Sequence, residues 1–351
     1  MEAAKLLPAS PISGSAKRPE RTQMRGFSPL PMGCRACYCP AMNRIVNKLN
    51  RLWKERAHRA AARAVLDTPP IVPADDGLVL FSMIGTRVLL PYLVAVKSLH
   101  AQLGKGRIVI LDDGTLTDTD RQILAAHLGN PHIVAIADID TAPCPRGQVW
   151  ERLLALLDMR AGDYVIQLDS DTVTLGDVPE IAAAIVQNRS FTLRGDPDSE
   201  LLSFAEMAEK SDDDAFLYNP AAHVQGAIEC GLDRVSLPMV TNPHYVRGCA
   251  GFAGFARGGD GRALAEAFSR EAERLLGAER WARWGSEQVT SNIVIANEPD
   301  PLLLPYDHYL NFWDEGVPPD ARFVHFIGSY RFSGNAYIDA TRTAIAALGR
   351  A

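Results

Sequence analysis

The 351-residue sequence has no apolar run long enough to cross a membrane. Its longest apolar stretch, residues 88–96, includes Pro91, whereas a transmembrane helix needs about 20 apolar residues. The N-terminus also lacks the continuous apolar core of a secretory signal. We therefore expect a cytoplasmic protein.

The body of the chain lacks the positive charge that nucleic-acid binding requires. Residues 1–66 hold 13 lysines and arginines against 3 glutamates, whereas the remainder holds 23 basic and 39 acidic residues. The net charge of -6 therefore combines a basic N-terminal segment with an acidic body. We expect no nucleic-acid partner.

Cysteines are few, and they form no complete metal site. Cys34, Cys37 and Cys39 are clustered, but no second cluster or histidine pair completes a zinc site. Six cysteines spread through a long chain are typical of free thiols in a reducing compartment. A structural metal at the cluster is the alternative.

The first 41 residues lack hydrophobic periodicity and are rich in proline, serine, glycine and arginine. This composition predicts disorder. An alternative is that the natural start is Met42, which would make the upstream segment an annotation artefact.

Residues 43–66 have the periodicity of a helix with one apolar side. That side carries Ile45, Leu49, Leu52, Trp53 and Ala60, and seven basic residues cover the rest. One interpretation is a solvated helix packed on the domain. The other is a basic amphipathic helix lying on an anionic membrane, at the inner face of the bilayer.

From residue 71 onward the sequence predicts a regular alternation of strands and helices. The predicted strands are 78–84, 107–111, 132–137 and 164–168, and the predicted helices are 89–103, 118–128 and 149–159. This order predicts an α/β fold with a mostly parallel sheet flanked by helices, as in nucleotide-binding domains. No Gly-x-Gly-x-x-Gly follows the first strand and no Walker-type loop is present, which argues against dinucleotide oxidoreductases and P-loop enzymes.

The second half is less regular and shows no internal repeat. It predicts helices at 178–187 and 261–276 and strands at 190–194, 248–256 and 322–327. The glycine-rich strand 248–256 is typical of a place where a ligand or another backbone approaches closely. We expect a disordered segment at 1–41, a basic helix at 42–70 and a catalytic domain at 71–351, divided into a Rossmann-like nucleotide-binding half (71–175) and an acceptor half (176–351).

The most informative motif is Asp169-Ser170-Asp171, directly after the apolar run 164–168. Open α/β sheets bind their ligands at the carboxyl ends of the strands. If the backbone stays extended, alternation places Asp169 and Asp171 on the same side. Two such carboxylates repel each other unless a cation lies between them or one stays protonated, so a divalent metal that also holds phosphates is one interpretation. A capped turn is the other.

Other acidic clusters are better explained as turns or solvated loops. These are Asp112-Asp113, Asp138-Ile139-Asp140, Asp196-Pro197-Asp198 and Asp212-Asp213-Asp214.

Several ordered segments together resemble the family 8 retaining glycosyltransferases, which have a GT-A fold and include lipopolysaccharide galactosyl- and glucosyltransferases and glycogenin. The resemblance spans roughly residues 77–334. It rests on four segments: 162–180 with the D-x-D motif, Ala250-Gly251, Glu287-Gln288 with Asn292, and His325-x-x-Gly328-x-x-Arg331.

The resemblance implies a role for each matching residue. Asp169, Asp171 and His325 would bind Mn²⁺ or Mg²⁺, and imidazole favours manganese. A lone histidine on an apolar strand is otherwise a satisfied core residue. The resemblance implies a UDP-sugar as donor, held by the residues of the matching motifs: Arg152, Asp169, Ser170, Asp171, Ala250, Gly251, Gly328 and Arg331. Arg152 has a second interpretation, a surface ion pair. Glu287 or Gln288 would be catalytic, on the β-face of the sugar.

The chain departs from the family pattern at four positions. Cys249 replaces an asparagine, Glu287 and Val289 replace two aspartates, and Arg331 replaces a lysine. The implied function is transfer of a hexose from a nucleotide-diphospho-sugar to a glycan or glycolipid, as in cell-envelope polysaccharide synthesis, with retention. The alternatives are a catalytically inactive nucleotide- or carbohydrate-binding module and a sugar-1-phosphate nucleotidyltransferase.

Overall fold

The computed structural model describes residues 40–211, 214–328 and 330–350, with side chains described from Leu49 onward except at 214 and 215. The cluster Cys34, Cys37 and Cys39 lies outside the described residues, as do residues 1–39 of the segment predicted to be disordered. Two of the three aspartates at 212–214 also lie outside them.

The chain divides into two compact units, Met1–Val46 and Asn47–Ala351. Of the first unit, the structure describes only the beginning of helix α1 (Pro40–Ala62). The second unit carries all the other elements. The predicted boundaries at 41 and 70 stay predictions.

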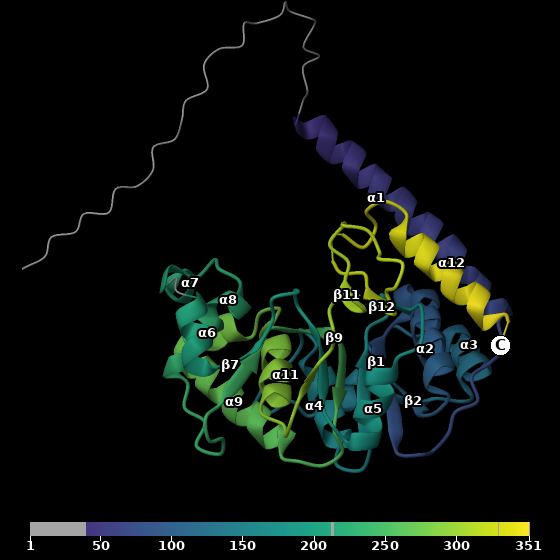
Figure 1. Ribbon diagram of the computed structural model, residues 1–351. Helices are drawn as coiled ribbons and strands as arrows, with labels where there is room; N and C mark the ends of the chain where they lie inside the picture. Colours follow the sequence, from purple (N-terminus) through teal and green to yellow (C-terminus); the bar gives the residue numbers. More distant parts are fainter. Residues whose placement is uncertain (1–39, 212–213, 329, 351) are drawn as a thin grey trace, which may run out of the picture. The chain divides into compact units, whose positions relative to one another are not determined.

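A seven-stranded sheet forms the centre of the second unit (Figure 1), in the order β10-β6-β9-β4-β1-β2-β3. Its strands are β1 (Leu78–Ile84), β2 (Arg107–Asp112), β3 (His132–Ala135), β4 (Tyr164–Leu168), β6 (Phe191–Arg194), β9 (Gly248–Phe255) and β10 (Leu302–Leu303). The first four pair in parallel, whereas β9 runs antiparallel to both β4 and β6. The predicted α/β class with a mostly parallel sheet is confirmed.

The four helices of the first half begin and end close to the predicted positions. They are α2 (Leu89–Leu103), α3 (Asp118–Leu128), α4 (Trp150–Met159) and α5 (Pro179–Gln187). Helix α3 begins with a capping box formed by Thr117 and Asp120, and it ends at Gly129, whose φ of 66° suits glycine. These bounds agree closely with the predicted helices. The predicted strand 132–137 is shorter, because Ile136–Asp138 form a 3₁₀ turn.

The sheet separates two apolar layers, as strand alternation requires. Leu80 of β1 faces a layer that includes α2, α5 and α12 (Ala336–Leu348), whereas Phe81 faces a layer that includes α4 and α9 (Gly261–Leu276). Every residue of β4 is buried, which explains why four of its five residues are apolar. The carboxyl end of β4 therefore lies between the two halves of the sheet.

The second half contains several short elements that the sequence did not predict. They are β7 (Leu201–Ser203), α6 (Phe204–Ser211), α7 (Asp214–Tyr218), α8 (Val224–Glu229), β8 (His244–Val246), α10 (Ala278–Trp281) and α11 (Ser286–Ala296). Strands β7 and β8 pair in a two-stranded sheet. Helix α11 packs against β9 and α9.

A small three-stranded sheet joins a segment from the middle of the chain to two segments near its end. Its strands are β5 (Thr172–Thr174), β11 (Tyr309–Asn311) and β12 (Phe323–His325), in the order β11-β12-β5. Strand β12 is shorter than the predicted strand 322–327. It pairs with β5 so that His325 lies opposite Thr172. The sheet thereby brings a late segment of the chain next to the end of β4.

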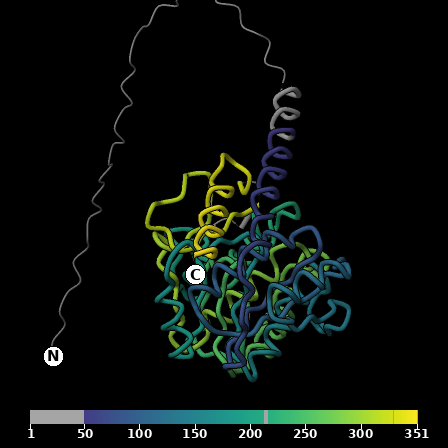
Figure 2. Tube along the Cα trace, turned by 90° about the vertical axis from the view of Figure 1, so that its right-hand side faces the viewer, coloured from purple at the N-terminus to yellow at the C-terminus, as the bar shows by residue number. Residues whose placement is uncertain are grey.

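Helix α12 runs beside α1, here considered from Asn47 onward, as both views show (Figures 1 and 2). His58 of α1 is buried, stacks on Tyr337 at 3.6 Å between ring centroids and lies 3.0 Å from the Thr341 hydroxyl. The predicted helix 43–66 ends as an α-helix at Ala62 and continues as a 3₁₀ turn over Arg63–Asp67. Among the described helices, none combines the length and apolar composition that crossing a bilayer requires.

Candidate metal and donor site

The D-x-D motif follows β4 directly, but its backbone does not stay extended. Residues 170 and 171 form a turn, in which the Thr172 hydroxyl donates to the Asp169 carbonyl at 2.8 Å. The Asp169 amide donates to the Gly251 carbonyl of β9, also at 2.8 Å. The condition of an extended backbone is therefore not met, because the chain turns here to enter β5. The two carboxylates nevertheless converge.

His325 completes a group of three possible metal ligands with Asp169 and Asp171. One ligand atom from each residue lies within 4.8 Å of the other two. In the part of the chain that the structure describes, no other such group occurs. The predicted ligand set is therefore brought together, about 150 residues apart in the sequence.

The ring of His325 is oriented by Asn311. The amide nitrogen of Asn311 donates to the carbonyls of Arg194 and Gly195 at 2.8 and 3.1 Å, so its oxygen faces the histidine. His325 Nδ1 lies 3.0 Å from that oxygen and therefore carries the hydrogen. The other nitrogen, Nε2, faces Asp171 at 3.4 Å. Histidines that bind a metal are commonly held in this way, with the second ring nitrogen hydrogen-bonded to a fixed acceptor.

The pKa values of Asp171 and His325 reflect their mutual contact. Burial raises the pKa of Asp171, but His325 and Arg331 outweigh it and hold the value below the ordinary range. Burial lowers the pKa of His325, but Cys249 and Asp171 outweigh it and hold the value well above the ordinary range.

Gly251 provides the space that His325 occupies. A Cβ atom at Gly251 would lie 2.3 Å from Cε1 and 2.6 Å from Nε2 of the imidazole. The sequence predicted that a ligand or another backbone approaches this strand closely. The group that approaches it at Gly251 is the side chain of His325. Cys249, two residues earlier, places its sulfur 3.2 Å from His325 Nδ1.

Arg152 is buried in α4 and links two of the predicted site residues. It forms ion pairs with Asp169 and with Glu287, the latter at 3.2 Å between Nη2 and Oε1. The interpretation as a surface ion pair was wrong, because the arginine faces the interior. Burial raises the pKa of Glu287 to about 7, against the opposing effect of Arg152.

Gln288 lies next to Glu287 on α11 and is half-buried. Its oxygen accepts from the Ala250 amide at 3.3 Å, and its nitrogen donates to Gln225 at 3.1 Å. The structure thus places Ala250, Gly251, Glu287 and Gln288 around the same end of β9. Val289, by contrast, is fully buried in the core.

Arg331 pairs with Asp171 through Nη2, and its Nε donates to the Phe326 carbonyl at 3.0 Å. Gly328 has a φ of 42°, in the region that favours glycine. Ser170 is held by its carbonyl, which accepts from the Tyr337 hydroxyl at 3.4 Å. The predicted motif His325-x-x-Gly328-x-x-Arg331 therefore surrounds the D-x-D turn, although residue 329 lies outside the described residues.

Three competing acidic clusters are turns, as predicted. In each, an aspartate side chain accepts a backbone hydrogen bond two residues later: Asp112 from Gly114, Asp140 from Ala142 and Asp196 from Asp198. The distances are between 2.9 and 3.0 Å.

No family model matches the chain, and no curated protein matches it. Several solved structures are similar. The apo structure of the bifunctional glycosyltransferase WbbM shares 14% identity, with a TM-score of 0.47 over 80% of this chain and 53% of that chain. This chain thus spans about half the length of that protein.

Two further solved structures show the same level of similarity. The galactosyltransferase LgtC, in complex with donor and acceptor sugar analogues, shares 11% identity over 77% of this chain and 95% of that chain, with a TM-score of 0.46. Core-mannan synthase A from Aspergillus fumigatus, in a Mn/GDP form, shares 10% identity over 79% and 86%, with a TM-score of 0.40. At these values the similarity assigns neither a family nor a function.

Proposed function

We propose that the chain is a metal-dependent glycosyltransferase of the GT-A type. It would transfer a hexose from a nucleotide-diphospho-sugar, most simply a UDP-sugar, to a glycan or glycolipid acceptor with retention. The observation that carries the proposal is the convergence of Asp169, Asp171 and His325 at the carboxyl end of β4. At this strand the parallel part of the sheet meets the antiparallel strand β9, and open α/β sheets bind ligands at the carboxyl ends of their strands.

The chemistry of the three ligands fits a divalent ion. Arg331 bonds Oδ2 of Asp171, which leaves Oδ1 facing His325 Nε2, and Arg152 bonds Oδ1 of Asp169, which leaves its second oxygen. Two carboxylate oxygens and one imidazole nitrogen suit Mn²⁺ better than Mg²⁺. When bound, the ion would neutralise charge on the diphosphate of the donor.

The remaining residues take roles that match their positions. Arg331 is partly exposed beside Asp171 and would add positive charge at the departing diphosphate. Gly328 would let backbone amides approach the phosphates. Of the two catalytic candidates, Gln288 is the more exposed and would face the sugar. Glu287, buried against Arg152, would balance the positive charge of that arginine.

The nucleotidyltransferase alternative gains no support from the loop after β1. A Cβ atom at Gly85 would lie 2.2 Å from the Asp113 carboxylate and from the Thr115 hydroxyl. This loop is therefore filled by its own neighbours and does not form a glycine- and lysine-rich phosphate cradle.

Binding of UDP in the presence and absence of Mn²⁺, measured by calorimetry, tests the proposal. We expect metal-dependent binding that is lost in Asp171→Ala and retained in Asp140→Ala, an exposed turn aspartate. The proposal would be refuted if UDP bound equally well with and without Mn²⁺ and equally well to Asp171→Ala and the wild type. A screen of UDP- and GDP-sugars, scored by metal-dependent nucleotide release, then separates an active transferase from an inactive binding module.

We also propose that α1 places the protein on an anionic membrane surface in the cytoplasm. Its apolar side is not the side that packs on the body: Leu49, Leu52 and Trp53 are 60%, 44% and 61% exposed. Arg56, Arg59 and Arg63 are exposed and follow Trp53 at spacings of three and four residues, so they share this outer face. An apolar and basic face on an otherwise acidic body suits anionic lipid.

Co-sedimentation with phosphatidylglycerol vesicles tests the membrane contact. We expect the double variant Leu49→Ser/Trp53→Ser to lose most of its binding, and 1 M salt to weaken the wild type. Trp284→Ser is the matched control, because Trp284 is 63% exposed on the surface of the body. Equal binding of the two variants would contradict the proposal. Deleting residues 1–66 is less informative, since Ala62 and Val65 belong to the core.

A further inference from the structure

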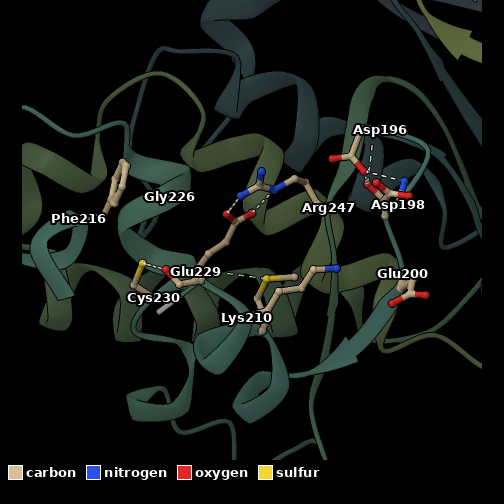
Figure 3. A pocket seen from close by; sticks show the side chains of 12 residues that line it. Asp196, Asp198, Glu200, Lys210, Phe216, Gly226, Glu229, Cys230 and Arg247 are labelled. Atoms are coloured by element: carbon tan, nitrogen blue, oxygen red, sulfur yellow. Dashed lines mark hydrogen bonds and ion pairs between the residues drawn. The ribbon is translucent and has the colours of Figure 1, made fainter. Parts of the chain in front are cut away.

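A cavity of about 470 Å³ lies between α6, α7, α8 and the loop that follows β6 (Figure 3). Its volume is within the range of about 300–1,000 Å³ that is usual for small-molecule sites. Asp196, Asp198 and Glu200 line it from the loop, and Lys210 and Phe216 from α6 and α7. Asp169, Asp171 and His325 do not line it, so the cavity is distinct from the metal ligands.

Glu229 forms a fixed part of the cavity wall. Its side chain is fully buried and accepts from the Tyr245 hydroxyl at 2.8 Å, from Gln225 at 3.0 Å and from Arg247 Nε at 3.1 Å. Arg247 also forms an ion pair with it (Figure 3). The charges of Glu229 and Arg247 therefore cancel each other within the wall.

A short chain of hydrogen bonds connects this wall to the proposed sugar site. Gln225 donates to Glu229, and its oxygen accepts from Gln288 at 3.1 Å. Gln288 in turn accepts from the Ala250 amide. Only one side chain in this hydrogen-bonded chain, that of Gln225, separates the cavity wall from Gln288, so the cavity adjoins the proposed sugar site.

We infer that this cavity binds a sugar unit of the acceptor, and that this unit is neutral or carries an amine. The inference rests on the proposed function. Phe216 is 45% exposed and offers an apolar ring face, while carboxylates accept hydrogen bonds from sugar hydroxyls. Because the charges of Glu229 and Arg247 cancel each other, the remaining charges of the lining are the carboxylates of Asp196, Asp198 and Glu200 and the amine of Lys210. A phosphorylated or uronic sugar would be repelled by this excess of negative charge.

Gly226 allows the cavity to be filled in a controlled way. A Cβ atom there would lie 3.4 Å from Cδ1 of Phe216, an ordinary contact. Gly226→Ala should therefore leave the cavity open, whereas Gly226→Leu should occupy it. The double variant Asp198→Asn/Glu200→Gln changes only exposed side chains and removes two of the charges without filling the space.

The experiment is saturation-transfer NMR on the full chain without nucleotide. The probes are the methyl glycosides of glucose, galactose and mannose, glucosamine and glucuronic acid. We expect at least one neutral or amino glycoside to bind at least fivefold more tightly than the glucuronide. Gly226→Leu should weaken that binding at least tenfold and Gly226→Ala should not. Asp198→Asn/Glu200→Gln should narrow the difference between the neutral sugar and the glucuronide.

Mn²⁺-dependent UDP binding is measured on the same proteins, so that the two proposals fail separately. The inference is wrong if UDP binds normally but no neutral or amino glycoside binds. It is also wrong if Gly226→Leu binds the sugar as the wild type does, or if the glucuronide binds as well as the neutral sugars. Sugar binding in the cavity without any metal-dependent UDP binding would instead contradict the transferase.

Discussion

Gly251 lies directly against the imidazole ring of His325, so closely that a methyl group at Gly251 would stand 2.3 Å from Cε1. Real Cβ atoms do not approach other atoms this closely, so either the ring or strand β9 would have to move. Since the ring is also fixed by Asn311, the position of His325, the proposed third metal ligand, depends on the absence of a side chain at residue 251.

Gly251→Ala should therefore displace His325 and weaken Mn²⁺-dependent UDP binding by at least about tenfold, the effect expected when a ligand loses its support. Calorimetric titration measures this. Gly176→Ala is the matched control, since a Cβ atom there would meet its nearest neighbour at 3.8 Å. Unchanged binding in Gly251→Ala would show that His325 is not a ligand.

The side-chain oxygen of Asn311 should affect the affinity for Mn²⁺, and its side-chain nitrogen should affect the stability of the fold. Asn311→Leu removes the acceptor for His325 Nδ1 and should weaken Mn²⁺ binding by about 10- to 100-fold. Asn311→Asp keeps an acceptor but loses the two hydrogen bonds to Arg194 and Gly195. It should bind metal nearly normally while unfolding at a lower denaturant concentration. If both variants lose metal equally, the role of Asn311 is only structural.

Arg152→Met should destabilise the protein by about 1–3 kcal/mol, because it leaves Glu287 buried without its ion-pair partner. The pKa of Glu287 is already about 7 and rises further without the arginine, so the carboxyl is neutral in the variant and the full cost of an unpaired buried charge does not arise. Guanidinium unfolding measures the loss. Arg342→Met, which removes an exposed pair with Asp339, should have no measurable effect. A loss below about 1 kcal/mol in Arg152→Met would contradict this expectation.

His58 should make the protein less stable in mild acid. Burial and the nearby Arg331 lower its pKa from 6.5 to about 4. Between these values the unfolded chain binds the proton and the folded chain does not, so stability falls as the pH drops from about 6.5 to 4, by about 3 kcal/mol in full.

The melting temperature at pH 7.5 and at pH 5 checks this expectation. His58→Gln should lose less than the wild type between the two values, although its melting temperature at pH 7.5 is lower. His132→Gln, an exposed histidine on β3, should follow the wild type. A His58→Gln curve parallel to that of the wild type would rule out His58 as the source.

The site residues that the sequence itself indicates are those whose neighbours in the sequence mark their position. Asp169 and Asp171 follow an apolar strand, which marks the carboxyl end of a buried element. His325 could be selected only through its resemblance to a motif, because a single histidine on an apolar strand has no signal of its own. Helix bounds in the first half were predictable because α2, α3 and α5 end at Gly104, Gly129 and Asn188, all in the left-handed region. Helix α3 also begins with a capping box, and α5 begins with a proline.

Residues that act across the fold were not predictable. Asn311 orients His325 from a three-residue strand, and nothing in its neighbours marks it. Arg152 could be interpreted as a surface residue, because the periodicity of a helix does not show whether other elements cover its polar side as well as its apolar side. Helices α6, α7 and α8 are each eight residues or shorter, too short for a clear period, so the cavity that they line was invisible in the sequence.

The pairing of β5 with β12 determines when Asp169, Asp171 and His325 can come together. During synthesis the segment that carries Asp169 and Asp171 leaves the ribosome about 150 residues before His325, and at about 5–20 residues per second this is an interval of about 8–30 seconds. Throughout that interval the nascent chain has two of the three proposed ligands and lacks the strand that supplies the third. The proposed metal site can therefore be complete only after β12 has paired with β5.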